Sequence, residues 1–356
     1  MKGFGAGFRS RSPLVLLVAA ALLVPALLGF EYLFASGAWS VVPLKYCLRN
    51  SGDSFTYVSW TVGHNKRQPP ALPSVYLTGG SAAREALVSG PSLAAAVQRL
   101  GGPRIAAWDL GCINQNFAET LAVADNVPDS PAWVLIGVNL GRFTAFPAQN
   151  EQQVVGRDFL LKSAFLQRYV SGTYGRYTYS STILPGIFSY LTSYLKKDGK
   201  SLLAAKAVQR DYRQHQYTAS GNHSVKQKQR MVAQWLTQRH PVFRRNLPYN
   251  LAMLRQILAR CRQRDVHAVI VELPRNERIV NGRFDAAVAA YQVPVAALSR
   301  EYGVPYLDFN AALDLPDGDF HDLSHLVEPG RVLWQHRLAQ ELVTLMGPSG
   351  DGGGVQ

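Results

Sequence analysis

Short apolar runs alternate with longer amphipathic stretches along two parts of this 356-residue chain. The predicted strands span residues 74–78, 104–108, 132–138, 267–273 and 304–309. Between them, apolar residues recur at helical spacing, which predicts helices over residues 82–87, 92–100, 116–124, 251–264, 284–302 and 329–346. This alternation indicates an α/β fold, a three-layer sandwich with a five-stranded parallel sheet that helices cover.

The alternation stops between residues 146 and 250, where tyrosines and basic residues dominate. We interpret this stretch as a basic helical insertion in a domain of residues 72–346, with a polar helical part over residues 201–235. Residues 183–195 are apolar and aromatic but contain Pro185-Gly186, and they are short for a membrane span. They either lie at a membrane interface or pack on the body of the domain, and we favour packing.

The N-terminal region has no charged residue from Ser12 to Phe30, about the length that a helix needs to cross a bilayer. Three basic residues precede it, so the positive-inside rule places residues 1–11 in the cytoplasm and the rest of the chain outside. We therefore predict a single-pass cell-membrane protein with a transmembrane signal-anchor over residues 12–34, a stalk over residues 35–71 and a disordered tail over residues 347–356.

A cleaved signal peptide is the alternative interpretation of this region. Ser36-Gly37-Ala38 has the small residues that suit a cleavage site. Glu31 and the bulky residues that follow it favour a retained anchor.

The charge of the chain is concentrated in one segment. The formal net charge is +13, and the stretch from Arg157 to Arg264 holds 20 Lys and Arg against three acidic residues. Such a segment suits an anionic polymer or lipid headgroups. Nucleic acid also fits the charge, but the predicted location outside the membrane argues against it, so we expect no nucleic-acid partner.

The three cysteines, Cys47, Cys112 and Cys261, form no CxxC pair and so predict neither a disulfide framework nor a zinc site. Cys112 and Cys261 fall in segments that we expect in the core, where a free thiol behaves as a small apolar group. One disulfide remains open for a domain outside the membrane.

Polar motifs follow three of the predicted strands. Gly79-Gly80-Ser81 follows the first, Asp109-Leu110-Gly111-Cys112-Ile113-Asn114 the second, and Asn139 ends the third. The carboxyl ends of parallel strands meet at one edge of a sheet, where open α/β folds bind ligands. Near the C-terminus, Asp322-Leu323-Ser324-His325 adds a base with a carboxylate three residues before it. A hydroxyl nucleophile, oxyanion donors and a base with its orienting carboxylate are the parts that acyl transfer needs.

This order of motifs resembles the SGNH hydrolases, a branch of the GDSL esterase family. The resemblance covers residues 72–145 and 265–345, and it implies a flavodoxin-like fold. It also implies that Ser81 is the nucleophile, His325 the base, Asp322 its orienting partner and Asn139 an oxyanion donor. No cofactor and no metal are required.

The sequence departs from the family pattern in the middle motifs. Gly80 stands where the family has Asp before the serine, and Leu140 stands where it has Asp after the asparagine. The glycine of the second block falls on Asn114, with Gly111 three residues earlier. Both residues are therefore candidates for the oxyanion hole beside Asn139.

Other interpretations compete at several of these residues. His321 and Asp319 are rivals for the base and its partner, and the acidic and histidine residues of 317–325 are dense enough for a metal site. Arg84 and Glu85 are expected to form a solvent-exposed pair, with substrate contact as the alternative. Residues 272–276 either line the cleft or form a plain turn.

The resemblance implies an extracytoplasmic serine esterase or O-acyltransferase that acts on an acylated cell-envelope polysaccharide or polymer. Membrane-tethered members of the family, such as the D-alanine-transfer and alginate O-acetylation proteins, share this architecture. By the same resemblance, a membrane-bound acyltransferase is an expected partner. The alternative is an inactive SGNH-like protein that binds an anionic glycan or a membrane surface through its basic insertion.

Overall fold

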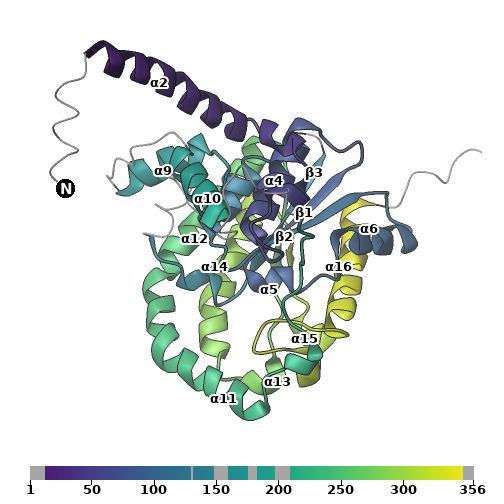
Figure 1. Cartoon of the computed structure of the whole chain (residues 1–356). Helices are drawn as coiled ribbons and strands as arrows, with labels where there is room; N and C mark the ends of the chain where they lie inside the picture. The colour runs from purple at the N-terminus through teal and green to yellow at the C-terminus, as the bar shows by residue number, and fades with distance from the viewer. Residues whose placement is uncertain (1–12, 130, 148–158, 175–182, 197–208, 348–356) are drawn as a thin grey trace, which may run out of the picture.

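The computed structural model describes residues 13–129, 131–147, 159–174, 183–196 and 209–347 (Figure 1). The predicted tails, residues 1–11 and those beyond residue 347, lie outside the described residues. So do parts of the predicted insertion between residues 148 and 208.

A five-stranded parallel sheet lies at the centre of the domain, in the order β2-β1-β3-β4-β5. Its strands are β1 (Ser74–Gly79), β2 (Ala106–Gly111), β3 (Ala132–Val138), β4 (His267–Glu272) and β5 (Tyr306–Leu307). The predicted parallel α/β sheet is confirmed, although β5 is shorter than expected. Gly79 pairs with Gly111 and Thr78 with Ile136, so the carboxyl ends of the first three strands are level.

Helices cover both faces of this sheet because side chains alternate between two buried clusters. Tyr76 packs in one cluster, whereas Val75 and Leu77 pack in the other. The first face is covered by α4 (Ser54–Arg67), α7 (Phe117–Ala124), α12 (His240–Gln263) and α14 (Asp285–Tyr302). The second is covered by α5 (Ser81–Arg84), α6 (Gly90–Arg99) and α16 (Gly330–Met346).

The predicted stalk is wrong for its central part. Short turns, η1 (Ala38–Val41) and α3 (Leu44–Cys47), lead into α4, whose Val58 and Val62 are fully buried in the core. Asn65 of α4 donates a hydrogen bond to the Tyr76 hydroxyl at 3.2 Å. The reason is that α4 buries a face of mostly small polar residues around Val58 and Val62, so the sequence shows no clear apolar stripe there. Residues 38–67 therefore belong to the domain.

The insertion is only partly helical. The short turn η2 (Arg142–Thr144) precedes it. The insertion contains α9 (Ala164–Tyr174), α10 (Leu184–Lys196), η3 (Ala219–Gly221) and α11 (Val225–Gln234), and α11 runs through a π-helical turn, η4 (Trp235–Arg239), into α12. The helix predicted over residues 201–235 is wrong where the structure describes it before residue 225, because residues 209–218 have no regular secondary structure. We call these residues the strap, since they run across the domain from Lys45 to Glu85 at the end of α5.

Helix α2 (Pro13–Ala35) is long and apolar enough to cross a membrane, and its apolar stretch is not buried in the domain (Figure 1). Only its last turns pack: Glu31 accepts two hydrogen bonds from the Ile183 N–H, at 2.9 and 3.1 Å, and Phe34 stacks on Trp39. Ile187 of α10 is buried in the same cluster, so α10 packs on the body, while Phe188 remains exposed.

All three cysteines are buried, and none of them forms a disulfide. Burial raises the pKa of Cys47 to about 11 and that of Cys261 to about 12, which is typical of inert core thiols.

The remaining elements are short helices within the loops at the carboxyl side of the sheet. They are α13 (Glu277–Val280), α15 (Asn310–Leu313) and η5 (Asp317–Asp319). The last of these begins the loop that carries Asp322 and His325.

Candidate active site

The turn between β1 and α5 presents Ser81 at the carboxyl edge of the sheet. Gly79 has a φ of +155°, and a Cβ there would lie 2.7 Å from the Ala83 Cβ, so only glycine fits. Its N–H donates to Gln115 Oε1 at 2.6 Å, which ties the turn to the β2–α7 loop. Ser81 is the first residue of α5 and is partly exposed.

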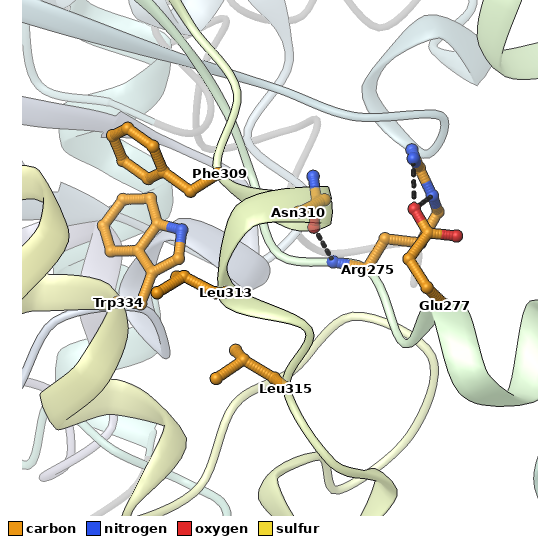
Figure 2. Close-up of a pocket in the computed structure, with 7 residues that line it drawn as sticks. All are labelled: Arg275, Glu277, Phe309, Asn310, Leu313, Leu315 and Trp334. Atoms are coloured by element: carbon orange, nitrogen blue, oxygen red, sulfur yellow. Dashed lines mark hydrogen bonds and ion pairs between the residues drawn. The ribbon is translucent and has the colours of Figure 1, made fainter.

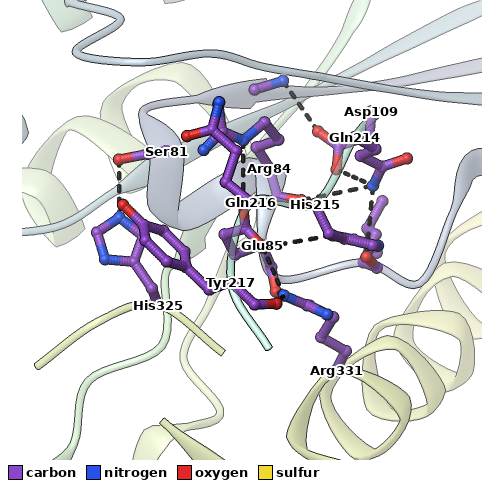
Figure 3. Close-up of polar contacts among 12 residues, drawn as sticks. Ser81, Arg84, Glu85, Asp109, Gln214, His215, Gln216, Tyr217, His325 and Arg331 are labelled. Carbon is purple, nitrogen blue, oxygen red and sulfur yellow. Dashed lines mark hydrogen bonds and ion pairs between the residues drawn. The ribbon is translucent and has the colours of Figure 1, made fainter. Parts of the chain in front are cut away.

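The structure brings Ser81, His325 and Asp322 together over a sequence separation of 244 residues. His325 Nε2 lies 2.8 Å from Ser81 Oγ, and His325 Nδ1 lies 2.7 Å from Asp322 Oδ2 (Figure 3). This chain of hydrogen bonds gives the hydroxyl a base in reach, and gives that base a carboxylate on its other nitrogen.

The loop around Asp322 holds its carboxylate in the ionised form. Asp322 Oδ1 accepts hydrogen bonds from the backbone N–H groups of Ser324 and His325, at 2.9 and 3.0 Å. Burial opposes ionisation, but these bonds and the one with the His325 ring outweigh it and lower the pKa of Asp322 to about 2. The carboxylate is therefore charged at neutral pH.

Two side chains from other elements brace this loop. Asn276, after β4, donates to Asp317 Oδ1 at 2.7 Å and to the Asp322 carbonyl at 3.3 Å. The buried Lys228 of α11 donates to Asp317 Oδ1 and to the Phe320 carbonyl, at 2.6 and 2.8 Å. The sequence alone predicts neither role, although Asn276 lies in the polar stretch that follows β4. The insertion thus supports the loop that carries His325.

Asn139 directly follows β3. Because β3 pairs with β1, Asn139 lies at the same carboxyl edge of the sheet as Ser81. Its side-chain oxygen accepts a hydrogen bond from the Arg142 N–H at 3.1 Å. That bond directs the side-chain oxygen of Asn139 toward the backbone, so the NH2 group of the same amide stays available as a donor. Arg142 itself is buried, donates to the carbonyls of Gly137 and Asn116, and lies over the Phe117 ring.

The two candidates after β2 differ in what their groups do. The Gly111 N–H donates to Asp109 Oδ1 at 2.9 Å, so it is already engaged inside the turn. A Cβ at Gly111 would lie 2.4 Å from the Arg84 N, which explains the glycine by close packing. Asn114 is exposed at the same edge with a φ of +54°, a conformation that Asn tolerates.

The expected solvent-exposed pair of Arg84 and Glu85 is wrong. Arg84 is 1% exposed and Glu85 is fully buried, because the strap covers them. Glu85 accepts from Arg331 Nη2 at 2.5 Å, from Arg84 Nε at 3.2 Å and from the Gln216 N–H of the strap at 3.0 Å. Burial raises the pKa of Glu85, but the hydrogen bonds from His215 and Gln216 and the two arginine charges outweigh it, and the pKa is lowered.

His321, the rival base, stacks on Tyr217 at a ring-centroid distance of 4.2 Å, and no bond from it to Ser81 is seen. Burial lowers the pKa of His321. Asp319 is buried beneath the same loop, and burial raises its pKa. Within the part of the chain that the structure describes, no three His, Cys, Asp or Glu side chains converge as metal ligands.

Residues 272–276 do not form one cleft wall. Glu272 is buried and accepts hydrogen bonds from the hydroxyls of Tyr291 and Tyr306, and burial raises its pKa to about 7. Arg275 pairs with Glu277 and lines a small pocket beside α15 (Figure 2). That pocket has a volume of about 10 Å³, barely enough for one water, and Ser81, Asp322 and His325 do not line it.

The sequence matches no known protein-family model and no curated protein. The geometry of the residues themselves therefore carries the functional argument.

Proposed function

We propose that this protein is a serine esterase or O-acyltransferase that works through an acyl-serine intermediate at Ser81. The observation that carries the proposal is the chain of two hydrogen bonds from Asp322 through His325 to Ser81, at 2.7 and 2.8 Å. Its order and residue types are those of the SGNH hydrolases, and the strand order of the sheet is the one found in flavodoxin-like folds.

In the first half of the reaction, Ser81 Oγ attacks the carbonyl carbon of an ester while His325 Nε2 takes the hydroxyl proton. Asp322 keeps the Nδ1 proton of the ring in place and stabilises the imidazolium that forms. The tetrahedral intermediate collapses when the C–O bond to the leaving alcohol breaks and that alcohol takes the proton from Nε2. In the second half, water or another alcohol attacks the acyl-serine with the same proton transfers in reverse order.

The developing oxyanion needs hydrogen-bond donors at the carboxyl edge of the sheet. The Asn139 NH2 group and the Ser81 N–H are the donors that we assign, because the first N–H groups of a helix have no helical acceptor. Asn114 is the third candidate, since it lies at the same edge and is exposed. We leave Gly111 out of this set because its N–H bonds to Asp109.

We further propose that α2 anchors the protein in the cell membrane and that the catalytic domain is extracytoplasmic. The length and apolar surface of α2 support the anchor, and the basic residues before it support the orientation. An acylated envelope polysaccharide or polymer is then the substrate class, with a membrane-bound acyltransferase as the partner that supplies or receives acyl groups.

The alternative is an inactive protein that binds an anionic glycan through the basic insertion. Two cations of the insertion already pair with carboxylates, Lys162 with Glu31 and Lys228 with Asp317. Three basic residues that follow it in α12 are paired too: Arg255 with Glu301, Arg260 with Asp125 and Arg264 with Asp129. This pairing removes part of the charge on which the alternative depends.

The test is ester turnover by the full chain in detergent. We expect the protein to hydrolyse p-nitrophenyl acetate, and Ser81→Ala to lower kcat by a factor of about 10⁴ or more. Ser51→Ala, at an exposed serine, is the matched control and should keep full activity. Equal turnover by wild type and Ser81→Ala would exclude the acyl-serine mechanism. Binding to an anionic glycan that survives in Ser81→Ala, without any turnover by the wild type, would favour the alternative.

A further inference from the structure

A buried guanidinium beside the nucleophile has hydrogen-bond donors that are not used. Arg84 is 1% exposed, and its Nε donates to Glu85 Oε1 at 3.2 Å. Its Nη1 and Nη2 are buried and have no hydrogen-bond partner among the residues that the structure describes. Because buried polar groups in folded proteins are almost always hydrogen-bonded, two unpaired donors on a charged group call for a partner.

The position of Arg84 connects it to the proposed chemistry. It lies three residues after Ser81 in α5, and residues at this spacing project from the same side of a helix. Its backbone is also packed against the end of β2, where Gly111 allows close approach. The guanidinium and the nucleophile are thus carried by one short, rigidly held turn.

The cover over Arg84 is polar. Gln214 Nε2 donates to Asp109 Oδ2 at 2.8 Å, and the Gln216 N–H donates to Glu85 Oε1 at 3.0 Å. The Tyr217 carbonyl accepts from Arg331 Nη2 at 2.9 Å, and its ring lies 4.8 Å from that of His325. Figure 3 shows this part of the strap between the Ser81–His325 pair on one side and Asp109 on the other.

These contacts make the cover displaceable. Gln216 is exposed to solvent, and residues 214–216 are held by hydrogen bonds to carbonyl and carboxyl groups, while the partly exposed Tyr217 ring stacks on the ring of His321. Water or a polar ligand can replace hydrogen bonds of this kind at small net cost.

The charge around Arg84 favours an anion. Arg84 and Arg331 carry two positive charges, and Glu85 is the one carboxylate that is ionised among them, because its pKa is lowered. Burial raises the pKa of Asp109 to about 8, so this neighbour is mostly neutral at pH 7. His215 faces Glu85 from the strap.

We propose that Arg84 binds an oxyanion of the substrate, a carboxylate or a phosphate, after residues 214–217 of the strap move aside. The two Nη groups form one edge of a planar fork, which fits two oxygens of such a group. An anionic polymer unit held there places its ester next to Ser81. This inference rests on the proposed function and narrows its substrate class to anionic units.

The test compares three acetyl esters on the full chain in detergent: those of methyl glucuronide, glycerol 3-phosphate and methyl glucoside. We expect kcat/KM for at least one anionic ester to exceed that of the neutral glucoside ester by roughly ten- to hundredfold, mainly through KM. The ester that is preferred distinguishes a carboxylate from a phosphate. Arg84→Gln should bring the ratio of anionic to neutral kcat/KM close to one, and Arg84→Lys should leave an intermediate ratio.

A second measurement does not depend on the folding of these variants. Free glucuronate or inorganic phosphate should slow the labelling of wild-type Ser81 by a fluorophosphonate, whereas methyl glucoside at equal ionic strength should not. Turnover without any preference for an anionic ester, or a preference that Arg84→Gln retains, overturns the role of Arg84 and leaves the acyl-serine proposal standing. No labelling and no turnover with any ester overturns the proposed function itself, and with it the role of Arg84.

Discussion

The substitution Asp322→Asn is predicted to disable His325 by reversing the hydrogen bond to its Nδ1. Asp322 Oδ1 is held by two backbone N–H donors, those of Ser324 and His325. An asparagine keeps its oxygen on those donors, so its NH2 group faces His325 Nδ1, 2.7 Å from the Oδ2 that it replaces. The ring must then accept at Nδ1 and carry its proton on Nε2, where it cannot take the proton of Ser81.

The magnitude follows from this wrong tautomer. We expect kcat for p-nitrophenyl acetate to fall by about 10³ to 10⁴, with little change in KM. Asp314→Asn is the matched control, because Asp314 is a largely exposed carboxylate of a nearby loop that pairs with Arg278. It should keep activity within about twofold.

The same substitution has a stability signature. The folded pKa of Asp322 is lowered from 3.8 to about 2, so the charged group stabilises the fold above pH 4 and this contribution is lost as the pH falls toward 2. The shift corresponds to about 2 kcal/mol of unfolding free energy, which Asp322→Asn should remove from the acid limb of a denaturation series. A variant that keeps a third or more of wild-type kcat, or an acid limb identical to that of the wild type, would refute the orienting role of Asp322.

Three further predictions concern the edge of the sheet. Asn139→Ala should lower kcat for the same ester by roughly 10² to 10³, with a small fall in melting temperature from the lost hydrogen bond of the Arg142 N–H, and an unchanged kcat would exclude Asn139 from the oxyanion hole. Gly111→Ala should destabilise the protein by about 1 to 3 kcal/mol in a urea titration, because the new Cβ would lie 2.4 Å from the Arg84 N, whereas Gly318→Ala, with open space around it, should be neutral. The pKa of Asp109 is raised from 3.8 to about 8, so its contribution to the free energy of unfolding is full below pH 4 and is lost as the pH rises through 8. Asp109→Asn should therefore make the free energy of unfolding depend less on pH between 4 and 8. An equal pH dependence in the variant and the wild type would contradict this prediction.

The sequence predicted the elements whose pattern is local. The strands at 74–78 and 132–138 and the helices at 284–302 and 329–346 are predicted closely because each is a single apolar run or a regular helical stripe. Ser81, Asp322 and His325 were found because their motifs lie at strand ends or in one short loop. That they meet within 2.8 Å follows from the folding of the chain and could not be derived from spacing alone.

The errors arose where burial depends on a distant segment. Arg84 and Glu85 resemble a surface pair in the local sequence, but the strap, more than 120 residues later, and Arg331 of α16 bury them. The sequence of α4 predicts a stalk because its buried positions include small polar residues such as Ser59 and Thr61. In both cases the decisive contact is non-local, and periodicity within one segment carries no information about it.

The measurement that tests the central claim most directly is the mass of the protein after reaction with a fluorophosphonate, followed by peptide mapping. The account predicts one adduct per chain, on Ser81, which is absent in Ser81→Ala and forms far more slowly in His325→Ala. A folded protein that gains no adduct, or that carries it on another residue while Ser81 stays free, would contradict the account.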